Sequence, residues 1–405
     1  MKIDTSAKKI KELLNRSIEK VYPSKEKLKQ VLMSGKRLRV YFGVDPTAPF
    51  LHLDHATNLL ILKRFQELGH EVILLVGDFT ARIGDPSGKV SPRRQLSKKE
   101  VIKNYKDYKK QSAKILDFNR KENPAKIVFN SEWFEKMKVE ELIGLMSKLT
   151  VGRIIVRDMF QERIKKGKEI YLHEFLYPLL QGYDSVALNV DVEIGGTDQT
   201  FNMLIGRDLL KIFKGKEKFI ITKKLLEDPK TGKFLMSKSE GRYIALNDSP
   251  FEMYGKIMKL PDEVLVTCFQ HWTEIKMSEI AKIEKGLNLG ELNPKKAKQR
   301  LAREVVTMYY NKRSAMEAEK EFNRVFKEKK LPSKIKKLRV KEKNWNILEL
   351  LKEASLIKSK SEGKRLIRQK GVKIEGKVQK DWREKIKIKK GMIIQIGKRR
   401  IVKLV

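Results

Sequence analysis

Continuous apolar segments alternate with helix-length segments through the first half of the chain. Three of them have the length and β-branched content of buried strands: RVYFGV (39–44), EVILLVG (71–77) and KIVFN (126–130). The intervening periodicity predicts helices over 54–68 and roughly 98–116, and VDVEIGG (190–196) predicts a further strand. Strands that are buried on both faces and joined by helices predict an α/β fold, with a parallel sheet between two layers of helices.

The pattern changes near residue 248. Helical periodicity continues to about residue 327, and a Lys-rich segment with a proline but no periodicity follows. Beyond it, two short helical segments, 346–353 and 360–370, precede short alternating strands with glycine turns. These changes predict four parts: an α/β domain over 1–247, an all-helical domain over 248–327, a linker over 328–344 and a small α+β domain over 345–405.

The chain is strongly basic. Its 405 residues include 90 Lys and Arg against 51 Asp and Glu, a formal charge of +39, which favours nucleic acid as a partner ahead of a membrane surface. The single cysteine, Cys268, excludes an intramolecular disulfide and a Cys-based zinc site. The charged N-terminus lacks the apolar region of a secretion signal, and no apolar run is long enough to span a bilayer. We therefore expect a cytoplasmic protein that binds no membrane.

Residues 52–55, HLDH, follow the first strand and begin a helix. Ligands bind at this place in a parallel sheet, because a helix N-terminus with free N–H groups attracts phosphate. His52 and His55 are suited to donate to phosphate oxygens. A metal site would need further ligands nearby, and a polar helix-start residue beside an exposed histidine would need no ligand at all. On this stretch alone the three interpretations stay open.

Three further polar segments lie in apolar surroundings: YPLLQGYDS (177–185), IGGTDQTFN (194–202) and FLMSKSEG (234–241). The first two fit a buried structural network as well as a pocket, but polar groups at strand ends favour recognition. The third is by itself typical of a solvated turn. No G-x-G-x-x-G follows a strand, and GDPSGK (84–89) departs from the Walker pattern in its glycine spacing. A dinucleotide dehydrogenase or a P-loop ATPase is therefore disfavoured.

In this order and spacing, the segments resemble tyrosyl-tRNA synthetases, class I aminoacyl-tRNA synthetases of the bacterial type. YFGVDPTAPFLHLDH resembles the family's opening motif with its HIGH sequence, GDFTARIGDPSGK follows it, YPLLQGYD and IGGTDQ resemble the amino-acid pocket, and LMSKS resembles the KMSKS loop. The C-terminal part resembles the small RNA-binding domain of ribosomal protein S-four. The resemblance covers essentially the whole chain. It implies a Rossmann-like catalytic domain, a helical domain on the anticodon side of tRNA and a C-terminal RNA-binding domain.

The resemblance also implies roles for individual residues. For tyrosine it implies Tyr41 and Asp184 at the phenol, and Asp85, Tyr177, Gln181 and Gln199 at the amino and carboxylate groups. For ATP it implies Gly43, Asp45, His52, His55, Gly196, Asp198 and Lys238. For catalysis at the phosphates it implies Thr47, His52, His55, Lys238 and Ser239, and for the tRNA acceptor end Lys89 and Arg93.

The implied reaction has two steps. The carboxylate of L-tyrosine attacks the α-phosphate of MgATP and expels pyrophosphate, and the tyrosyl group then passes to the terminal ribose of tRNA(Tyr). The nucleophile is already ionised, so catalysis requires positioning and donors for the charge that grows on the phosphates, which His, Thr and Lys can supply. On this interpretation the two histidines face phosphate, and no protein-bound metal is expected. The resemblance further implies a homodimer.

Three positions depart from the family pattern. Asp54 stands where the family has glycine beside the adenine, and Glu193 stands at a pocket edge often held by glutamine. Leu235 stands where KMSKS has its first lysine, with Lys233 two residues away. We expect Asp54 to cap the helix with its carboxylate turned away from the adenine, which contributes about 1 kcal/mol.

These departures motivate an alternative hypothesis, a catalytically weakened paralogue that only binds tRNA or another structured RNA. The complete amino-acid pocket argues against it, because an RNA-binding protein has no use for such a pocket. The related tryptophanyl enzymes are disfavoured, since an indole offers no hydroxyl to Tyr41 and Asp184.

Overall fold

The computed structural model describes residues 2–405 except 88–93, 233, 237–240, 329, 332, 334, 341–343 and 398–399. The chain forms two compact units, residues 1–315 and 316–405. The α/β part of the first unit consists of α1 (Ala7–Asn15), β1 (Lys20–Tyr22), α2 (Lys25–Met33), β2 (Arg39–Val44), α3 (Leu53–Glu67), β3 (Glu71–Val76), η1 (Thr80–Arg82), α4 (Lys98–Tyr105), α5 (Tyr108–Ser112), β4 (Lys126–Phe129), α6 (Ser131–Phe134), α7 (Val139–Met146), α8 (Val151–Ile155), α9 (Asp158–Lys165), α10 (Leu172–Leu188), β5 (Val192–Gly196), η2 (Thr197–Gln199), α11 (Thr200–Lys214) and β6 (Phe219–Lys223).

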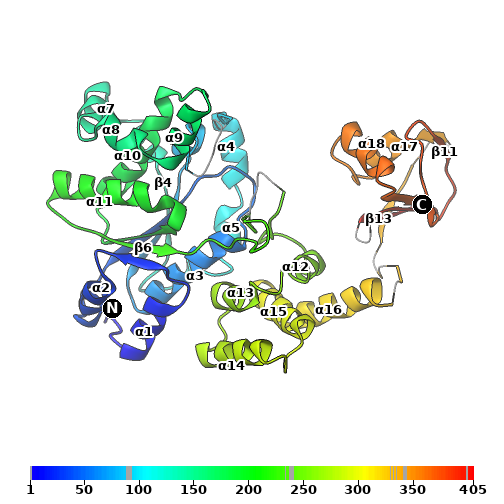
Figure 1. The fold of residues 1–405 in the computed structure, drawn as a ribbon, viewed down its shortest axis with the longest axis horizontal. Coiled ribbons are helices and arrows are strands. Elements are labelled where there is room, and N and C mark those ends of the chain that lie inside the picture. The colour runs from blue at the N-terminus through cyan, green and yellow to red at the C-terminus, as the bar shows by residue number, and fades with distance from the viewer. Residues whose placement is uncertain are drawn as a thin grey trace. The chain divides into compact units, whose positions relative to one another are not determined.

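The strands of this part form one six-stranded sheet in the order β1-β6-β5-β2-β3-β4. All neighbours are parallel except β1, which pairs antiparallel with β6. Figure 1 shows α10 and α11 on one side of the sheet and α3 on the other. The predicted α/β class with a parallel sheet is confirmed. From β2 the chain continues to β3 and β4 on one side and returns to β5 and β6 on the other, so a topological switch point lies between β2 and β5.

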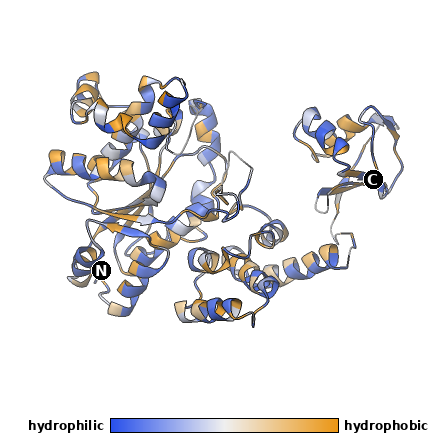
Figure 2. Cartoon of the chain, viewed as in Figure 1, coloured by the Kyte–Doolittle hydropathy of each residue, from blue (hydrophilic) through white to orange (hydrophobic). Residues whose placement is uncertain are grey.

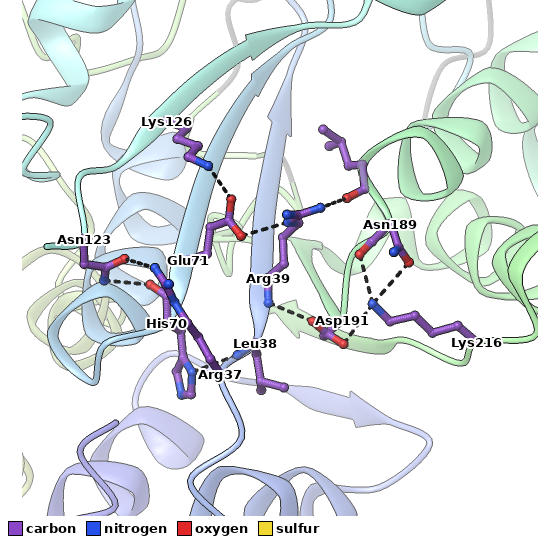
Figure 3. A network of polar contacts seen from close by, with 11 residues as sticks. Arg37, Leu38, Arg39, His70, Glu71, Asn123, Lys126, Asn189, Asp191 and Lys216 are labelled. Atoms are coloured by element: carbon purple, nitrogen blue, oxygen red, sulfur yellow. Dashed lines mark hydrogen bonds and ion pairs between the residues drawn. The ribbon is translucent and has the colours of Figure 1, made fainter. Parts of the chain in front are cut away.

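A polar network joins the amino ends of the central strands (Figure 3). The backbone N–H of Arg39 donates to Asp191 Oδ2 at 2.8 Å, and the Arg39 guanidinium donates to Glu71 Oε2 at 2.9 Å. Lys126 donates to the other oxygen of Glu71 at 2.7 Å. These contacts link β2, β3, β4 and the start of β5 at the edge where the strands begin, and they leave the opposite edge for a ligand.

From residue 250 onward the described elements of the first unit are helices. They are α12 (Pro250–Ile257), α13 (Leu265–Trp272), α14 (Met277–Asn288) and α15 (Pro294–Tyr309), and α16 (Lys312–Phe326) continues into the second unit. Blue and orange alternate along α14, α15 and α16 in Figure 2, which is the pattern of amphipathic helices. Among the described helices, none combines the length and the hydrophobicity that crossing a bilayer requires.

The second unit is a small α+β structure. Its elements are β7 (Lys336–Leu338), β8 (Asn344–Asn346), α17 (Ile347–Glu353), α18 (Lys360–Arg368), β9 (Val372–Ile374), β10 (Lys377–Val378), β11 (Lys385–Lys387), β12 (Ile393–Ile396) and β13 (Arg400–Leu404). Five strands form a sheet in the order β10-β9-β12-β13-β7. Aliphatic side chains of α17 and of the strands, among them Leu350, Val372 and Ile394, are fully buried together.

Two segments differ from the sequence predictions. The segment 328–344 contains β7, which pairs in parallel with β13, so residues 336–338 are part of the C-terminal sheet. The helix expected over 98–116 is two helices, α4 and α5, that meet near Asp107. The break orients the buried Tyr108, whose hydroxyl donates to the Ala48 carbonyl at 2.7 Å, and Gln111, which accepts from the Leu51 N–H at 2.8 Å. The domain boundaries at 247 and 327 stay predictions.

His70 makes the stability of the first unit dependent on pH. Its side chain is fully buried, and Nδ1 accepts from the Leu38 N–H at 3.2 Å. Burial, and secondarily the charge of Arg37, lower the pKa of His70 from 6.5 to about 4. Between these two values the unfolded chain binds a proton that the folded chain does not, so the free energy of unfolding falls by about 3 kcal/mol as the pH falls through this window.

We expect His70→Asn, whose amide oxygen can replace Nδ1 as the acceptor, to lose less stability than the parent between about pH 7 and about pH 4.5 in urea unfolding. His173→Asn, at a partly exposed histidine, is the control and should follow the parent. Equal losses in the parent and in His70→Asn would contradict the assignment.

Candidate functional site

A cavity of about 1010 Å³ lies at the carboxyl ends of β2 and β5, within the first unit. Every described residue that the resemblance assigned to tyrosine, ATP or catalysis lines it: Tyr41, Gly43, Asp45, Thr47, His52, His55, Asp85, Tyr177, Gln181, Asp184, Gly196, Asp198 and Gln199. Lys89, Arg93, Lys233, Lys238 and Ser239 lie outside the described residues. The parallel sheet brings these distant segments together because its strand ends meet at one edge.

Asp45, directly after β2, is held on both carboxylate oxygens. Thr80 donates to Oδ1 at 2.8 Å, and the Tyr177 hydroxyl donates to Oδ2 at 3.0 Å. A Cβ at Gly77 would overlap both the Asp45 carboxylate and the Thr80 hydroxyl, so only glycine fits there. Asp45 is thus fixed by the turn after β3 and by α10.

One end of the cavity contains two buried side chains that can hydrogen-bond a hydroxyl group, Tyr41 and Asp184. The Tyr41 hydroxyl lies 3.0 Å from Ser185 Oγ, and Asp184 accepts from Trp133 Nε1 at 3.0 Å and from Asn130 Nδ2 at 3.4 Å. Burial raises the pKa of Asp184 well above its usual value, and the carboxylates of Glu193 and Asp45 act in the same direction. Burial also raises the pKa of Tyr41, so this hydroxyl stays protonated. The arrangement suits a ligand that carries a hydroxyl on an apolar group.

Side-chain amides connect the middle of the cavity. Gln199 Nε2 donates to Asp85 Oδ2 at 2.8 Å and to Asp198 Oδ2 at 3.0 Å. Asn202 Nδ2 donates to Gln181 Oε1 at 2.9 Å and lies 3.2 Å from Gln199 Oε1. The carboxylates and amide oxygens in this network are acceptors, which suit a cationic group such as an ammonium.

The other end contains the two histidines. Their rings are stacked at the start of α3 with centroids 3.7 Å apart. The backbone N–H of His52 donates to Nδ1 of the His55 ring at 3.1 Å. A neutral His55 that accepts at Nδ1 carries its proton on Nε2, which makes Nε2 a donor. The Leu53 N–H donates to the Ile244 carbonyl at 3.0 Å, so the histidine segment is linked to the chain that follows the LMSKS segment.

The prediction that Asp54 caps α3 is wrong. Its carboxylate forms an ion pair with Lys223 at the end of β6, and Asp54 lines the cavity. The Lys223 side chain is fully buried, whereas that of Asp54 is 19% exposed. The pair forms because a buried ammonium needs a partner more strongly than the helix start needs another acceptor.

The described residues contain no group of three or more His, Cys, Asp or Glu side chains arranged to bind a metal ion. The two histidines stack on each other, and one ring nitrogen accepts a backbone N–H. This geometry does not favour the metal interpretation of HLDH.

Several residues at or next to the site escaped the sequence predictions, among them Asn130, Trp133, Ser185 and Lys218. Asn130 directly follows β4, and its position at a strand end could have identified it. Trp133, Ser185 and Lys218 carry no such signal, because their contacts with the cavity residues depend on packing between α6, α10 and the start of β6.

The chain is an α/β protein with a cavity at the switch point of its sheet, which is where nucleotide-binding α/β proteins bind their ligands, and two histidines at a helix start line this cavity. Residues 33–327 match the family of tRNA synthetases class I (W and Y). The chain belongs to this family.

Curated relatives extend the similarity over the whole chain. The chain is 44% identical over 395 residues to a tyrosine–tRNA ligase of Moorella thermoacetica, covering 97% of this chain and 94% of that protein. It is 41% identical to a tyrosine–tRNA ligase of Thermotoga maritima, covering 97% and 96%. Both therefore include the second unit.

Solved structures agree in fold. A C-terminally truncated mitochondrial tyrosyl-tRNA synthetase of Aspergillus nidulans superposes with a TM-score of 0.66 at 25% identity, covering 78% of this chain and 94% of that one. A tyrosyl-tRNA synthetase of Archaeoglobus fulgidus, solved with L-tyrosine, gives 0.59 at 21% identity, covering 78% and 99%. The latter similarity concerns the fold alone.

The ion pair between Asp54 and Lys223 leads to a stability prediction. Asp54→Gly introduces the residue that the resemblance implies at this position but leaves a buried ammonium unpaired, so we expect a loss of about 3 kcal/mol in the free energy of unfolding. Adding Lys223→Met removes the unpaired charge and should recover most of the loss. Urea unfolding of both single variants and the double variant gives the coupling energy. Additive losses would show that the two side chains act independently.

Proposed function

We propose that the chain is a tyrosine–tRNA ligase, which activates L-tyrosine with ATP to tyrosyl-adenylate, releases pyrophosphate and transfers tyrosine to the 3′-terminal ribose of tRNA(Tyr). One observation carries the proposal: a single cavity joins a buried hydroxyl-binding end to the histidine-bearing helix start. Membership in the class I family and the full-length similarity to tyrosine–tRNA ligases support it.

Tyrosine occupies the acidic end in this proposal. Asp184 accepts from the phenol hydroxyl, and Tyr41 is the second hydrogen-bonding group. Asp85, Tyr177 and Gln181 surround the α-ammonium, while Gln199 lies near the carboxylate. The acceptors of the amide network and the fixed position of Tyr177 on Asp45 support these roles.

ATP occupies the other end. Asp198 binds the ribose, and Gly43, Asp45 and Gly196 lie along the adenylate. A Cβ at Gly196 would overlap the Asp198 carboxylate and approach Leu225 Cδ2 to 3.0 Å, so glycine at this position leaves room for the carboxylate of Asp198. His52 and His55 face the phosphates, and the Nε2 donor of His55 supports that role.

The reaction needs no general base, because the attacking carboxylate is ionised. Positioning brings it in line with the α-phosphate of MgATP, and donors from Thr47, His52, His55, Lys238 and Ser239 stabilise the charge that develops on the phosphates. The metal enters with the substrate. The stacked histidine pair supports this scheme since its rings are held before ATP binds.

The second unit binds tRNA in this proposal, and Lys89 and Arg93 contact the acceptor end. Residues 351–405 carry 19 Lys and Arg against 5 Asp and Glu, a net charge of +14. Such an excess suits contact with RNA phosphates. The reaction and its tRNA substrate also support a cytoplasmic location.

A homodimer is supported by exposed apolar side chains on α7 and α8. Val139, Ile143 and Met146 recur at helical spacing and are 69%, 59% and 44% exposed, and Val151 on α8 is 63% exposed. A soluble monomer rarely leaves so many aliphatic side chains in water, and a second copy is the simplest partner. The molar mass in solution tests this point.

Tyrosine-dependent exchange between ATP and pyrophosphate tests the function. We expect the chain to catalyse it, because the exchange requires only the adenylation step. Tyr41→Phe and Asp184→Ala should each reduce the preference for tyrosine over phenylalanine by at least about tenfold, since each removes a buried hydrogen bond to the phenol. A chain that binds tRNA(Tyr) without exchange activity would support the weakened-paralogue alternative. An unchanged amino-acid preference in Asp184→Ala would refute the pocket assignment.

Truncation tests the second unit. Because β7 belongs to the C-terminal sheet, the chain should end after Lys330. In the truncated chain we expect exchange to stay within about twofold of the parent, while tRNA charging falls by at least about tenfold. The full-length chain should bind tRNA more weakly as the salt concentration increases. Equal loss of both activities would mean that the unit supports the fold of the catalytic part instead.

A further inference from the structure

A buried lysine lies directly behind the hydroxyl-binding end of the cavity. Lys218 precedes β6, and its ammonium donates to Ser185 Oγ at 2.5 Å and forms an ion pair with Glu193. The side chains of Lys218 and Glu193 are 0% and 3% exposed. No residue role implied by the resemblance includes Lys218 or Ser185.

The sheet register explains why this group reaches Tyr41. Tyr41 on β2 and Glu193 on β5 are register partners in parallel strands, so their side chains leave the same face. Ser185 on α10 covers this face, 3.0 Å from the Tyr41 hydroxyl and 3.4 Å from Glu193 Oε2. The Lys218 ammonium also lies 5.9 Å from the centre of the Tyr41 ring.

The packing of α10 and α11 leaves room for the ammonium. A Cβ at Gly206 on α11 would lie 2.6 Å from Lys218 Nζ and 3.0 Å from Ser185 Oγ. Glycine at this position therefore allows the charge to approach the serine. The side chains of Lys218 and Ser185 are thus buried between the sheet and the two helices.

We infer that Lys218 is a positioning residue for recognition of the phenol hydroxyl of tyrosine, acting through Ser185 and Glu193 on Tyr41 and Asp184. The inference rests on the proposed function and adds a specificity determinant to it.

The hydrogen bonds of Ser185 are the first reason to assign this role to Lys218. An ammonium can only donate, so Lys218 occupies a lone pair of Ser185, which keeps one proton and one further lone pair. These remaining groups face Glu193 and the Tyr41 hydroxyl. The lysine therefore restricts the orientations of both hydroxyls before the substrate arrives, which lowers the cost of binding a phenol.

Charge gives the second reason. Glu193 lies close enough to Asp184 to raise its pKa, and an unpaired Glu193 would favour the neutral form of Asp184 further. Lys218 offsets the charge of Glu193 and so opposes the rise in the pKa of Asp184, which favours the carboxylate form. A carboxylate is the stronger acceptor for a phenol, because a hydrogen bond to a charged group contributes more than one to a neutral group.

The test compares two variants with a matched control. Lys218→Met removes the charge at similar volume, and Ser185→Ala removes the oxygen between Lys218 and Tyr41 while the ion pair stays intact. Arg163→Met is the control because Arg163 and Glu174 form a similarly buried ion pair, 1% and 4% exposed, that does not line the cavity. For each, kcat/KM for tyrosine and for phenylalanine is measured by pyrophosphate exchange, together with KM for ATP and Tm.

We expect Lys218→Met to reduce the ratio of kcat/KM for tyrosine over phenylalanine by about tenfold or more, and Ser185→Ala by at least about threefold, with KM for ATP nearly unchanged. Arg163→Met should lower Tm without changing the ratio. If Lys218→Met does not fold, Ser185→Ala decides alone, because it leaves no buried charge unpaired. Unchanged ratios in an active parent and its variants overturn the inference but not the proposed function. A parent without tyrosine-dependent exchange overturns both.

Discussion

Six carboxylates among the described residues line one cavity of a chain whose formal charge is +39: Asp45, Asp54, Asp85, Asp184, Glu193 and Asp198. Such a concentration of negative charge is unfavourable in a partly buried site unless cations or hydrogen-bond donors compensate for it. The structure supplies both. Thr80 and Tyr177 donate to Asp45, Gln199 donates to Asp85 and Asp198, and buried lysines pair with Glu193 and Asp54. The geometry of the site depends on this compensation, because each carboxylate is oriented by the group that pairs with it.

The sequence predicts the strands whose ends form the site, but not the donors and cations that compensate for its carboxylates. The strands at 39–44 and 71–76 lie where their apolar runs indicate, because burial on both faces produces a continuous pattern that can be read locally. The sequence could predict that the residues at the strand ends lie close together in one cavity, since the carboxyl ends of parallel strands share one edge of the sheet. The pairing of Lys218 and Lys223 could not be expected, since nothing local distinguishes these two from the many exposed lysines.

Tertiary contacts also explain two predictions that were wrong, the single helix over 98–116 and the helix cap at Asp54. Neither glycine nor proline lies between α4 and α5. The break instead places the side chains of Tyr108 and Gln111 where they form hydrogen bonds with the loop before α3. Asp54 is a reasonable helix cap when the sequence alone is considered. Its carboxylate instead pairs with the buried ammonium of Lys223, because this ammonium needs a partner more strongly than the helix start needs another acceptor. In both cases the competing partner is distant in sequence.

The two buried lysines also explain how two departures from the family pattern fit one structure. Lys218 directly precedes the five-residue strand β6 and Lys223 is its last residue, so the two lie about 16 Å apart at the rise of an extended chain. Because side chains alternate along a strand, positions 218 and 223 point to opposite faces of the sheet. Lys218 meets Glu193 on the face covered by α10 and α11, and Lys223 meets Asp54 at the start of α3 on the other face. Strand β6 and the residue before it therefore provide one counter-ion on each face of the sheet. Loss of either lysine would leave its carboxylate without a cation, so the residue identities at 54 and 223, and at 193 and 218, are physically coupled.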